Sequence, residues 1–260
     1  MNAQNRRLRI AFYSHDTQGL GHIRRNLALA GALAEGSDSP AILLIAGAQI
    51  ANILHHPPGV DCLTLPAVAK SAQGLYAAQH LPMTLNELLV LRAQTIAQAL
   101  TTYRPDVLIV DKTPGGLMGE LLPALKRLRQ MGHTRCVLGL RDVLDEPIVA
   151  TGEWRKARGS ALVKRFYDAI WIYGDPMVYD AVREYDFLCD CASKVRFTGY
   201  LNRWEQQAVT ADERSSLIEE LALDVDRLAF CTVGGGQDGF DLARAFVQSE
   251  LPADAGAVIL

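Results

Sequence analysis

Residues 8–34, LRIAFYSHDTQGLGHIRRNLALAGALA, carry the pattern that decides the fold of this 260-residue chain. An apolar run at their start predicts a buried strand, and apolar residues at helical spacing predict a helix over about 22–35. Gly19 and Gly21 lie between the two, because glycine permits a tight turn and close backbone approach. His22 then stands at the helix start, at the sheet edge where open α/β folds bind ligands, and where a general base can reach a bound hydroxyl.

Strand-length apolar runs alternate with helical patterns through most of the chain. Runs such as Ala41-Ile42-Leu43-Leu44-Ile45 are apolar without interruption, which is typical of strands buried on both faces of a parallel sheet. Strands are expected at about 8–14, 41–46, 60–65, 106–111, 135–140, 169–173 and 194–198. The prediction is therefore an α/β fold, a Rossmann-like parallel sheet with helices on both faces.

Two long connections complete this first part of the chain. A helix expected at 84–102 ends at Tyr103-Arg104-Pro105-Asp106, because proline cannot continue a helix. The stretch from 66 to 82 has no clear period, so we expect a long loop, and such loops are often binding segments.

The pattern changes near residue 199. A polar helix is expected at 211–223, followed by a strand at 227–233, and the last residues, 257–260, resemble another buried strand. We expect one domain over 1–204 and the beginning of a second, truncated Rossmann-like domain over 205–260. The alternative is that the tail adds edge strands to the first sheet.

Composition excludes several classes of function. The net charge of −3 argues against general nucleic-acid binding. Five scattered cysteines predict no disulfide framework and favour reduced thiols in the cytosol, and Cys189-Asp-Cys191 lacks the second pair or nearby histidines of a metal site. The polar start indicates no signal peptide, and no apolar run approaches the ~20 residues that span a bilayer. A cytoplasmic protein is expected.

Asp111 ends a buried strand and should lie at the same sheet edge as His22. A carboxylate there can orient the imidazole and stabilise its protonated form. The alternative role for Asp111 is to cap the turn before a helix at about 117. Thr113 follows in the same turn.

Arg141 and Asp142 follow the next strand and fall at the same edge. Either side chain can contact a ligand, and a mutual surface ion pair is the alternative. A basic segment, Glu153 to Arg158 with Lys164 and Arg165, can contact an anionic membrane surface or form an ordinary solvated face.

A second glycine-rich turn, Gly234-Gly235-Gly236-Gln237-Asp238-Gly239, joins a strand to a helix. Successive backbone N–H groups and a helix N-terminus bind anions there without a cationic side chain, although Asp238 suits a helix cap better than a phosphate. The first turn lacks the third glycine of a dinucleotide fingerprint, since Arg24 occupies that position, and no Lys-Ser/Thr pair marks a P-loop.

Taken together, the Gly-x-Gly-His opening of the first helix and the Thr198-Gly199-Tyr200-Leu201 linker before the Gly-Gly-Gly-x-Asp-Gly loop resemble GT-B glycosyltransferases of the family 28 type. The layout is similar to the GlcNAc transferase of peptidoglycan synthesis and to diacylglycerol sugar transferases. It resembles most a bacterial group of predicted glycosyltransferases with the motif Arg-Asp-x-Leu-Asp-x-Pro, here residues 141–147. The resemblance implies two Rossmann-like domains, the first holding the acceptor and the second a nucleotide sugar.

The resemblance also implies roles for single residues. His22 would be the base that deprotonates the acceptor hydroxyl, with Asp111 as its supporting carboxylate. Inverting displacement at the anomeric carbon would follow, with the diphosphate held by backbone amides and with no metal or cofactor. The acceptor-side residues implied are Gly19, Gly21, Thr113, Arg141 and Asp142, and the donor diphosphate residues are Gly234, Gly235, Gly236 and Gln237.

The expected partners are a nucleotide-sugar donor, of the UDP type, and a lipid or saccharide acceptor, with peripheral contact at the inner membrane face as a further expectation. The family recognises the nucleotide base and ribose through residues downstream of the glycine loop, so these 260 residues are expected to be inactive alone. Two alternatives stay open: a non-hydrolysing nucleotide-sugar epimerase, and a non-enzymatic binding module.

Overall fold

The computed structural model describes residues 6–16, 20–36, 38–70, 75–201, 210–220, 227–233, 239–252 and 254–259. The chain divides into two compact units, residues 1–201 and 202–260. The domain boundary expected at 204/205 lies outside the described residues.

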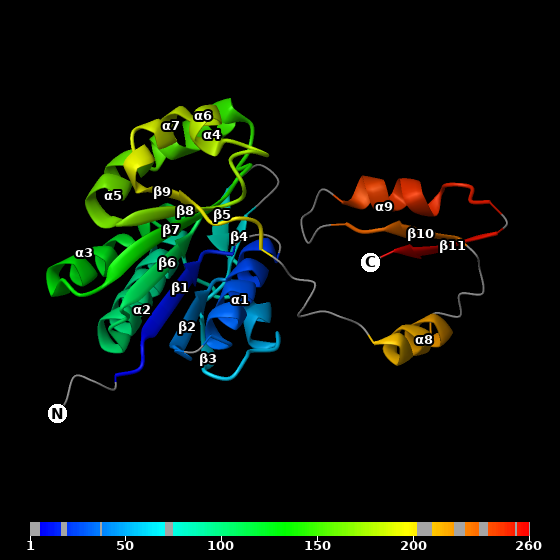
Figure 1. Ribbon diagram of the computed structural model, residues 1–260, viewed down its shortest axis with the longest axis horizontal. Helices are drawn as coiled ribbons and strands as arrows, with labels where there is room; N and C mark the ends of the chain where they lie inside the picture. The colour runs from blue at the N-terminus through cyan, green and yellow to red at the C-terminus, as the bar shows by residue number, and fades with distance from the viewer. Residues whose placement is uncertain are drawn as a thin grey trace. The chain divides into compact units, whose positions relative to one another are not determined.

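Unit 1 (residues 1–201) is built on one seven-stranded sheet in the order β3-β2-β1-β6-β7-β8-β9, with every neighbouring pair parallel (Figure 1). The strands are β1 (Arg9–Ser14), β2 (Ala41–Ala46), β3 (Val60–Thr64), β6 (Val107–Asp111), β7 (Arg135–Arg141), β8 (Ala169–Tyr173) and β9 (Val195–Phe197). The predicted Rossmann-like parallel sheet is confirmed. Since β1 pairs with β2 on one side and β6 on the other, the strand order reverses at β1, which is the switch point where such sheets bind ligands.

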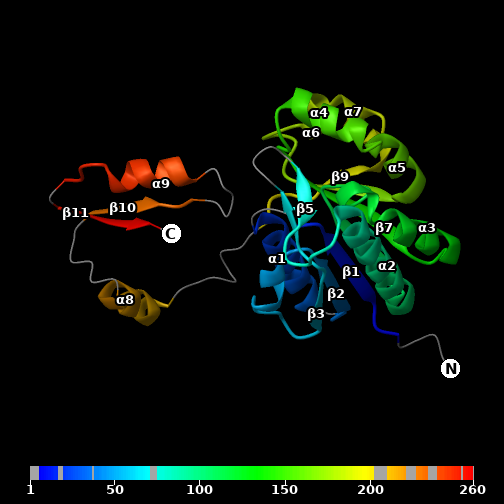
Figure 2. The ribbon, with the colours of Figure 1, turned by 180° about the vertical axis from the view of Figure 1, so that it is seen from behind.

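Helices cover both faces of the sheet because successive strand residues point to opposite sides. Ile10 and Phe12 of β1 pack in a cluster with Ile23 and Ala30 of helix α1, whereas Tyr13 packs in the larger cluster with residues of helices α2, α3 and α5. Helices α2 and α3 lie side by side in both views (Figure 1, Figure 2). The helices of unit 1 are α1 (Gly21–Ala34), α2 (Leu85–Tyr103), α3 (Leu122–Met131), α4 (Pro147–Lys156), α5 (Gly159–Phe166), α6 (Ala181–Glu184) and α7 (Asp186–Cys189), with 3-10 turns at Gln49–Asn52, Leu117–Gly119 and Ala192–Lys194.

Local sequence explains the ends of α2. Thr84 caps the helix through a capping box, in which its hydroxyl oxygen accepts from the Glu87 N–H and the Glu87 carboxylate accepts from the Thr84 N–H. At the other end Arg104 adopts a left-handed φ of 52° and Pro105 follows. The helix therefore ends at Tyr103, just before the proline, as the sequence predicted.

The stretch from 66 to 82 is not simply a loop, which corrects the sequence prediction. Strands β4 (Val68–Lys70) and β5 (Tyr76–Ala78) form an antiparallel pair within it. Val68 is buried in a small cluster with Leu88 and Leu117, and Tyr76 packs against that cluster. Strands of three residues are too short to show a period in the sequence, so tertiary packing determines them. The helix expected at about 117 is a 3-10 turn, and α3 begins at Leu122.

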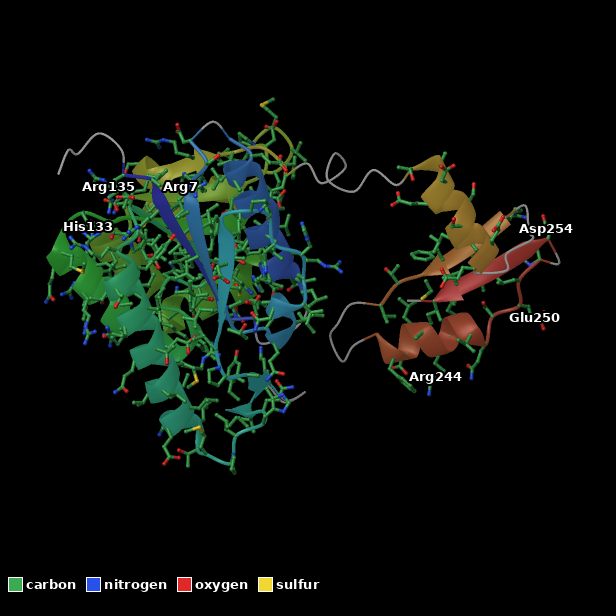
Figure 3. The ribbon with its side chains drawn as sticks, turned by 90° about the horizontal axis from the view of Figure 1, so that it is seen from below. Arg7, His133, Arg135, Arg244, Glu250 and Asp254 are labelled. Carbon is green, nitrogen blue, oxygen red and sulfur yellow. The ribbon has the colours of Figure 1, made fainter. Side chains whose placement is uncertain are left out.

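Unit 2 (residues 202–260) contains α8 (Ala211–Glu220), β10 (Arg227–Cys231), α9 (Phe240–Val247) and β11 (Ala255–Ile259). Strands β10 and β11 pair in parallel as a separate two-stranded sheet, so β10, α9 and β11 form a βαβ unit. Figure 3 shows Asp254, Glu250 and Arg244 on this unit, and Asp254 also forms an exposed ion pair with Arg227 at 3.8 Å. None of the described helices has the length and apolar character needed to cross a membrane.

A buried ion pair joins several loops at the carboxyl edge of the large sheet. The Arg92 guanidinium of α2 donates to both carboxylate oxygens of Glu120, at 2.6 and 2.7 Å, and both side chains are fully buried. Arg92 also donates to the Pro66 carbonyl at 2.6 Å. The Tyr13 hydroxyl donates to Glu120 at 2.6 Å and accepts from the Leu117 N–H. The network therefore connects the end of β1, the segment after β3, helix α2 and the turn after β6.

Glycine at position 116 makes room for this network. Gly116 has a φ of +69°, and a Cβ there would lie 2.6 Å from the Tyr13 hydroxyl oxygen. Burial, followed by the charge of Glu120, raises the pKa of Tyr13 well above its usual value, so the phenol stays a donor.

We expect Glu120→Gln to lower the free energy of unfolding by about 3–5 kcal/mol, because it leaves the buried Arg92 charge unpaired. Urea unfolding followed by tryptophan fluorescence measures the change. Arg135→Gln is the control, since its ion pair with Asp168 is exposed and should contribute less than about 1 kcal/mol. Equal costs for the two variants would show that the buried pair does not organise this edge.

Candidate active site

The structure brings His22 and Asp111 together at the switch point of the sheet. His22 is the second residue of α1, and Asp111 is the last residue of β6. The two side chains meet with Nδ1 2.6 Å from Oδ2. An ionised carboxylate can only accept, so Nδ1 of His22 donates the proton in this hydrogen bond. Among the described residues no protein group hydrogen-bonds Nε2, and the His22 side chain is 20 % exposed.

Arg25 also contacts Asp111, although it was not among the residues predicted for the site. Its guanidinium donates to the other carboxylate oxygen of Asp111 at 2.9 Å and lies 5.8 Å from the ring centre of Tyr173. The spacing of three residues from His22 was the available signal, because residues three apart share one helix face. The Asp111 side chain is only 1 % exposed, and a buried carboxylate is costly without partners. Arg25 and the hydrogen bond to His22 provide those partners.

His15 and Asp16 follow β1 directly and were also missed. The His15 ring centre lies 5.2 Å from that of His22, and burial, followed by the charges of His22 and Lys112, lowers the pKa of His15 to about 3. Burial raises the pKa of Asp16, and hydrogen bonds from Ser14 and the Gly47 N–H oppose this rise. Polar residues directly after the switch-point strand were the signal that could have identified them.

Buried polar atoms without a partner in the described part of the chain include Nδ1 of His15 and Oδ1 of Asp16 at this edge. Two residues here also adopt left-handed backbone conformations, Asp16 with φ 40° and Lys112 with φ 63°. Unsatisfied buried groups and strained backbone both cost free energy and concentrate at functional sites. The backbone at Gly47 also approaches this edge closely, since a Cβ there would lie 1.9 Å from the His15 carbonyl oxygen.

Of the glycines predicted to belong to the site, the structure describes only Gly21. Gly19 lies outside the described residues, as do Gly234, Gly235, Gly236 and Gln237. Gly21 begins α1, and a Cβ at this position would meet nothing within 4 Å. Among the described residues no neighbour requires glycine at position 21, and its expected role in ligand binding stays a prediction.

Thr113, Arg141 and Asp142 lie at the same sheet edge but do not contact His22 or Asp111 through their side chains in the described contacts. The Thr113 N–H donates to the Asp111 carbonyl at 2.7 Å, which closes the turn after β6. Arg141 donates to the Leu144 carbonyl, whereas the Asp142 carboxylate accepts from the Tyr200 hydroxyl and the Val143 N–H. The alternative of a mutual Arg141–Asp142 ion pair is therefore wrong, and their ligand-binding roles stay predictions.

Other charged and titratable groups lie away from this site. His133 has two buried ring nitrogens without a partner among the described residues, but it lies just before β7 begins, at the opposite sheet edge near Arg7 and Arg135 (Figure 3). The described residues contain no cluster of His, Cys, Asp and Glu that could hold a metal ion. The basic side chains of Arg155, Lys156, Arg158, Lys164 and Arg165 are exposed.

The fold is shared with enzymes of nucleotide-sugar chemistry. HepE (Alr3699) of Anabaena, solved in complex with UDP-glucose, superimposes with a TM-score of 0.57 at 15% identity, covering 97% of this chain and 60% of its own. A UDP-N-acetylglucosamine 2-epimerase matches with a TM-score of 0.57 at 11% identity, covering 97% and 63%. A glycosyltransferase of Rickettsia africae matches with a TM-score of 0.52 at 11% identity, covering 98% and 60%.

These similarities confirm the expected GT-B architecture at the level of the fold. This chain spans about three fifths of the length of those solved chains. No protein-family model matches the sequence, and no curated protein matches it either. Membership of family 28 therefore stays a prediction.

We expect Asp16→Asn to raise the free energy of unfolding at pH 7–8, with the gain disappearing on acidification. The folded-state pKa is raised, so the stability that Asp16 contributes is present below its unfolded pKa of 3.8 and is lost as pH rises through the folded value. Thermal unfolding from pH 3.5 to 8 measures this difference.

Glu87 provides the opposite control, because hydrogen bonds from Thr84 lower its pKa. Glu87→Gln should be less stable than wild type at pH 7, and its deficit should shrink as pH falls. A pH-independent loss of stability in Asp16→Asn would contradict the expected cost of the ionised carboxylate.

Proposed function

We propose that this chain belongs to a glycosyltransferase that moves a sugar from a nucleotide-sugar donor to an acceptor hydroxyl, with inversion and with His22 as the base. The observation that carries the proposal is the 2.6 Å contact between His22 Nδ1 and Asp111 Oδ2 at the switch point. It is the base and orienting-carboxylate arrangement that activates a hydroxyl nucleophile. The solved neighbour bound to UDP-glucose supports a donor of the UDP type.

The proposed step is a single displacement. Nε2 of His22 accepts the proton of the acceptor hydroxyl while the oxygen attacks the anomeric carbon. The bond from that carbon to the diphosphate oxygen breaks with its electron pair, and the nucleoside diphosphate leaves. Asp111 stabilises the imidazolium that forms, and Arg25 keeps this carboxylate in place through its 2.9 Å hydrogen bond.

The resemblance divides the remaining roles between the two parts of the chain. Residues 1–204 would hold the acceptor, with Gly19, Gly21, Thr113, Arg141 and Asp142 near it. Residues 205–260 would begin the donor side, with backbone N–H groups of Gly234, Gly235, Gly236 and Gln237 on the diphosphate.

We expect His22→Ala in the full-length gene product to lower sugar transfer by roughly 10²- to 10⁴-fold, the usual contribution of a general base. Donor affinity should stay within about twofold, because the base acts on the acceptor. Radiolabelled UDP-sugar transfer and donor titration measure the two quantities. His80→Ala is the control, since His80 is exposed, and it should behave as wild type. Normal turnover by His22→Ala would remove His22 from the mechanism.

A nucleotide-sugar epimerase is the second candidate, and the match to a UDP-N-acetylglucosamine 2-epimerase supports it. Incubation of the full-length protein with UDP-GlcNAc, without any acceptor, separates the two candidates. A transferase should leave the sugar unchanged when followed by anion-exchange chromatography and proton NMR. Conversion to an epimeric sugar under those conditions would favour the epimerase.

A further inference from the structure

A cavity of about 90 Å³ opens at the edge of the sheet that carries the His22–Asp111 pair. Lys112 and Thr113, which follow Asp111 directly, lie at its polar side. Lys112 follows directly the carboxylate that holds His22, so the cavity begins one residue from the candidate pair. The proposed function uses none of the apolar residues around this cavity.

The apolar wall comes from three separate segments of unit 1. Leu144 lies in the turn after β7, Ala150 and Trp154 lie on α4, and Phe187 lies on α7. All four are buried but keep 6–8 % of their surface exposed. In Figure 1 the helices α4 and α7 lie together above the sheet. The remaining lining includes the charged residues Lys112, Asp145 and Glu153.

Hydrogen bonds and stacking hold this wall in place. The rings of Trp154 and Phe187 stack with centres 4.4 Å apart at an angle of 18°. The Trp154 Nε1–H donates to the Ser160 hydroxyl at 3.0 Å. The Leu144 N–H donates to the Tyr185 hydroxyl, which in turn donates to the Asp145 carbonyl, both at 2.9 Å. The cavity is therefore preformed, as small-molecule sites usually are.

Glycine at position 159 contributes to the same preformed shape. A Cβ at Gly159 would lie 2.4 Å from the Trp154 ring, so only glycine lets the indole occupy this position. The ring closes one side of the cavity.

The size of the cavity restricts what it can hold. An apolar cavity of roughly 150 Å³ accommodates benzene. A cavity of about 90 Å³ is smaller than that and suits an aliphatic group of about three or four carbon atoms. A longer chain would extend out of this cavity and gain no further apolar contact within it.

We propose that this cavity binds a short aliphatic group of the acceptor, so that the acceptor is a small alcohol with an apolar end rather than a long-chain lipid. This inference rests on the proposed function, since it places the acceptor hydroxyl near His22. In this proposal the apolar end lies against Leu144, Ala150, Trp154 and Phe187, and the hydroxyl end lies toward Lys112 and Thr113, which follow Asp111 in the chain.

Binding of a series of n-alcohols, from methanol to n-octanol, tests the cavity without any donor. Saturation-transfer NMR titrations of the 260-residue chain give the affinity of each alcohol. We expect about a fourfold gain per added CH₂ up to about butanol, followed by a plateau. A gain that continues to octanol indicates a long-chain ligand and overturns the proposal, and so does the absence of any dependence on chain length.

Variants that change the cavity volume provide the second measurement. Ala150→Leu fills the cavity and should weaken butanol binding at least tenfold, whereas Val149→Leu, an exposed neighbour on the same helix, should change nothing. Leu144→Ala enlarges the cavity and should move the plateau to longer alcohols. This second variant keeps the test decisive if Ala150→Leu does not fold. Unchanged binding in Ala150→Leu, or an unmoved plateau in Leu144→Ala, would place the alcohol elsewhere and overturn the proposal.

The two proposals fail separately. If no alcohol binds with the expected dependence on chain length while sugar transfer is intact, the cavity assignment is overturned and the transferase proposal is unaffected. Intact, volume-dependent alcohol binding in a protein that transfers no sugar would support the cavity and count against the transferase.

Discussion

The buried ion pair between Arg92 and Glu120 is the interaction on which the carboxyl edge of the sheet depends. It replaces hydration of two charges by hydrogen bonds at 2.6 and 2.7 Å and extends to Pro66 and Tyr13. Burying two charges is costly unless every partner is in place, so the pair specifies one arrangement of the surrounding loops. Those loops follow β3 and β6, and the second of them carries the residues next to Asp111.

The rigid edge holds residues of the candidate site whose backbone conformation or burial costs free energy. Asp16 and Lys112 have left-handed backbone conformations, and His15 and Asp16 contain buried atoms without partners among the described residues. Burial keeps His15 neutral, so it adds no positive charge beside His22. Asp111, in contrast, has both carboxylate oxygens hydrogen-bonded. The site therefore combines an Asp111 carboxylate whose two oxygens are both hydrogen-bonded with neighbours whose buried polar atoms have no partner among the described residues.

Much of the fold could be predicted because parallel strands buried on both faces need uninterrupted apolar residues. The runs around Ile42 and Leu108 have this character, and their strands formed where expected. The pairing of His22 with Asp111 followed from a similar argument, since both side chains come directly from the carboxyl edge. The hairpin of Val68 and Tyr76 could not be predicted, because three-residue strands are stabilised by their burial against α2 rather than by a pattern of their own.

The sequence by itself determined the seven strands of the parallel sheet and the edge at which His22 and Asp111 meet. These features depend on local periodicity and on the rule that parallel strands end on the same side. Only the tertiary structure decided that Arg25 joins the pair, that Arg92 and Glu120 lie buried together, and that Trp154 and Phe187 enclose a small apolar cavity. Each of these contacts joins residues from separate elements, and the angles and distances at which elements pack leave no periodic trace in the chain.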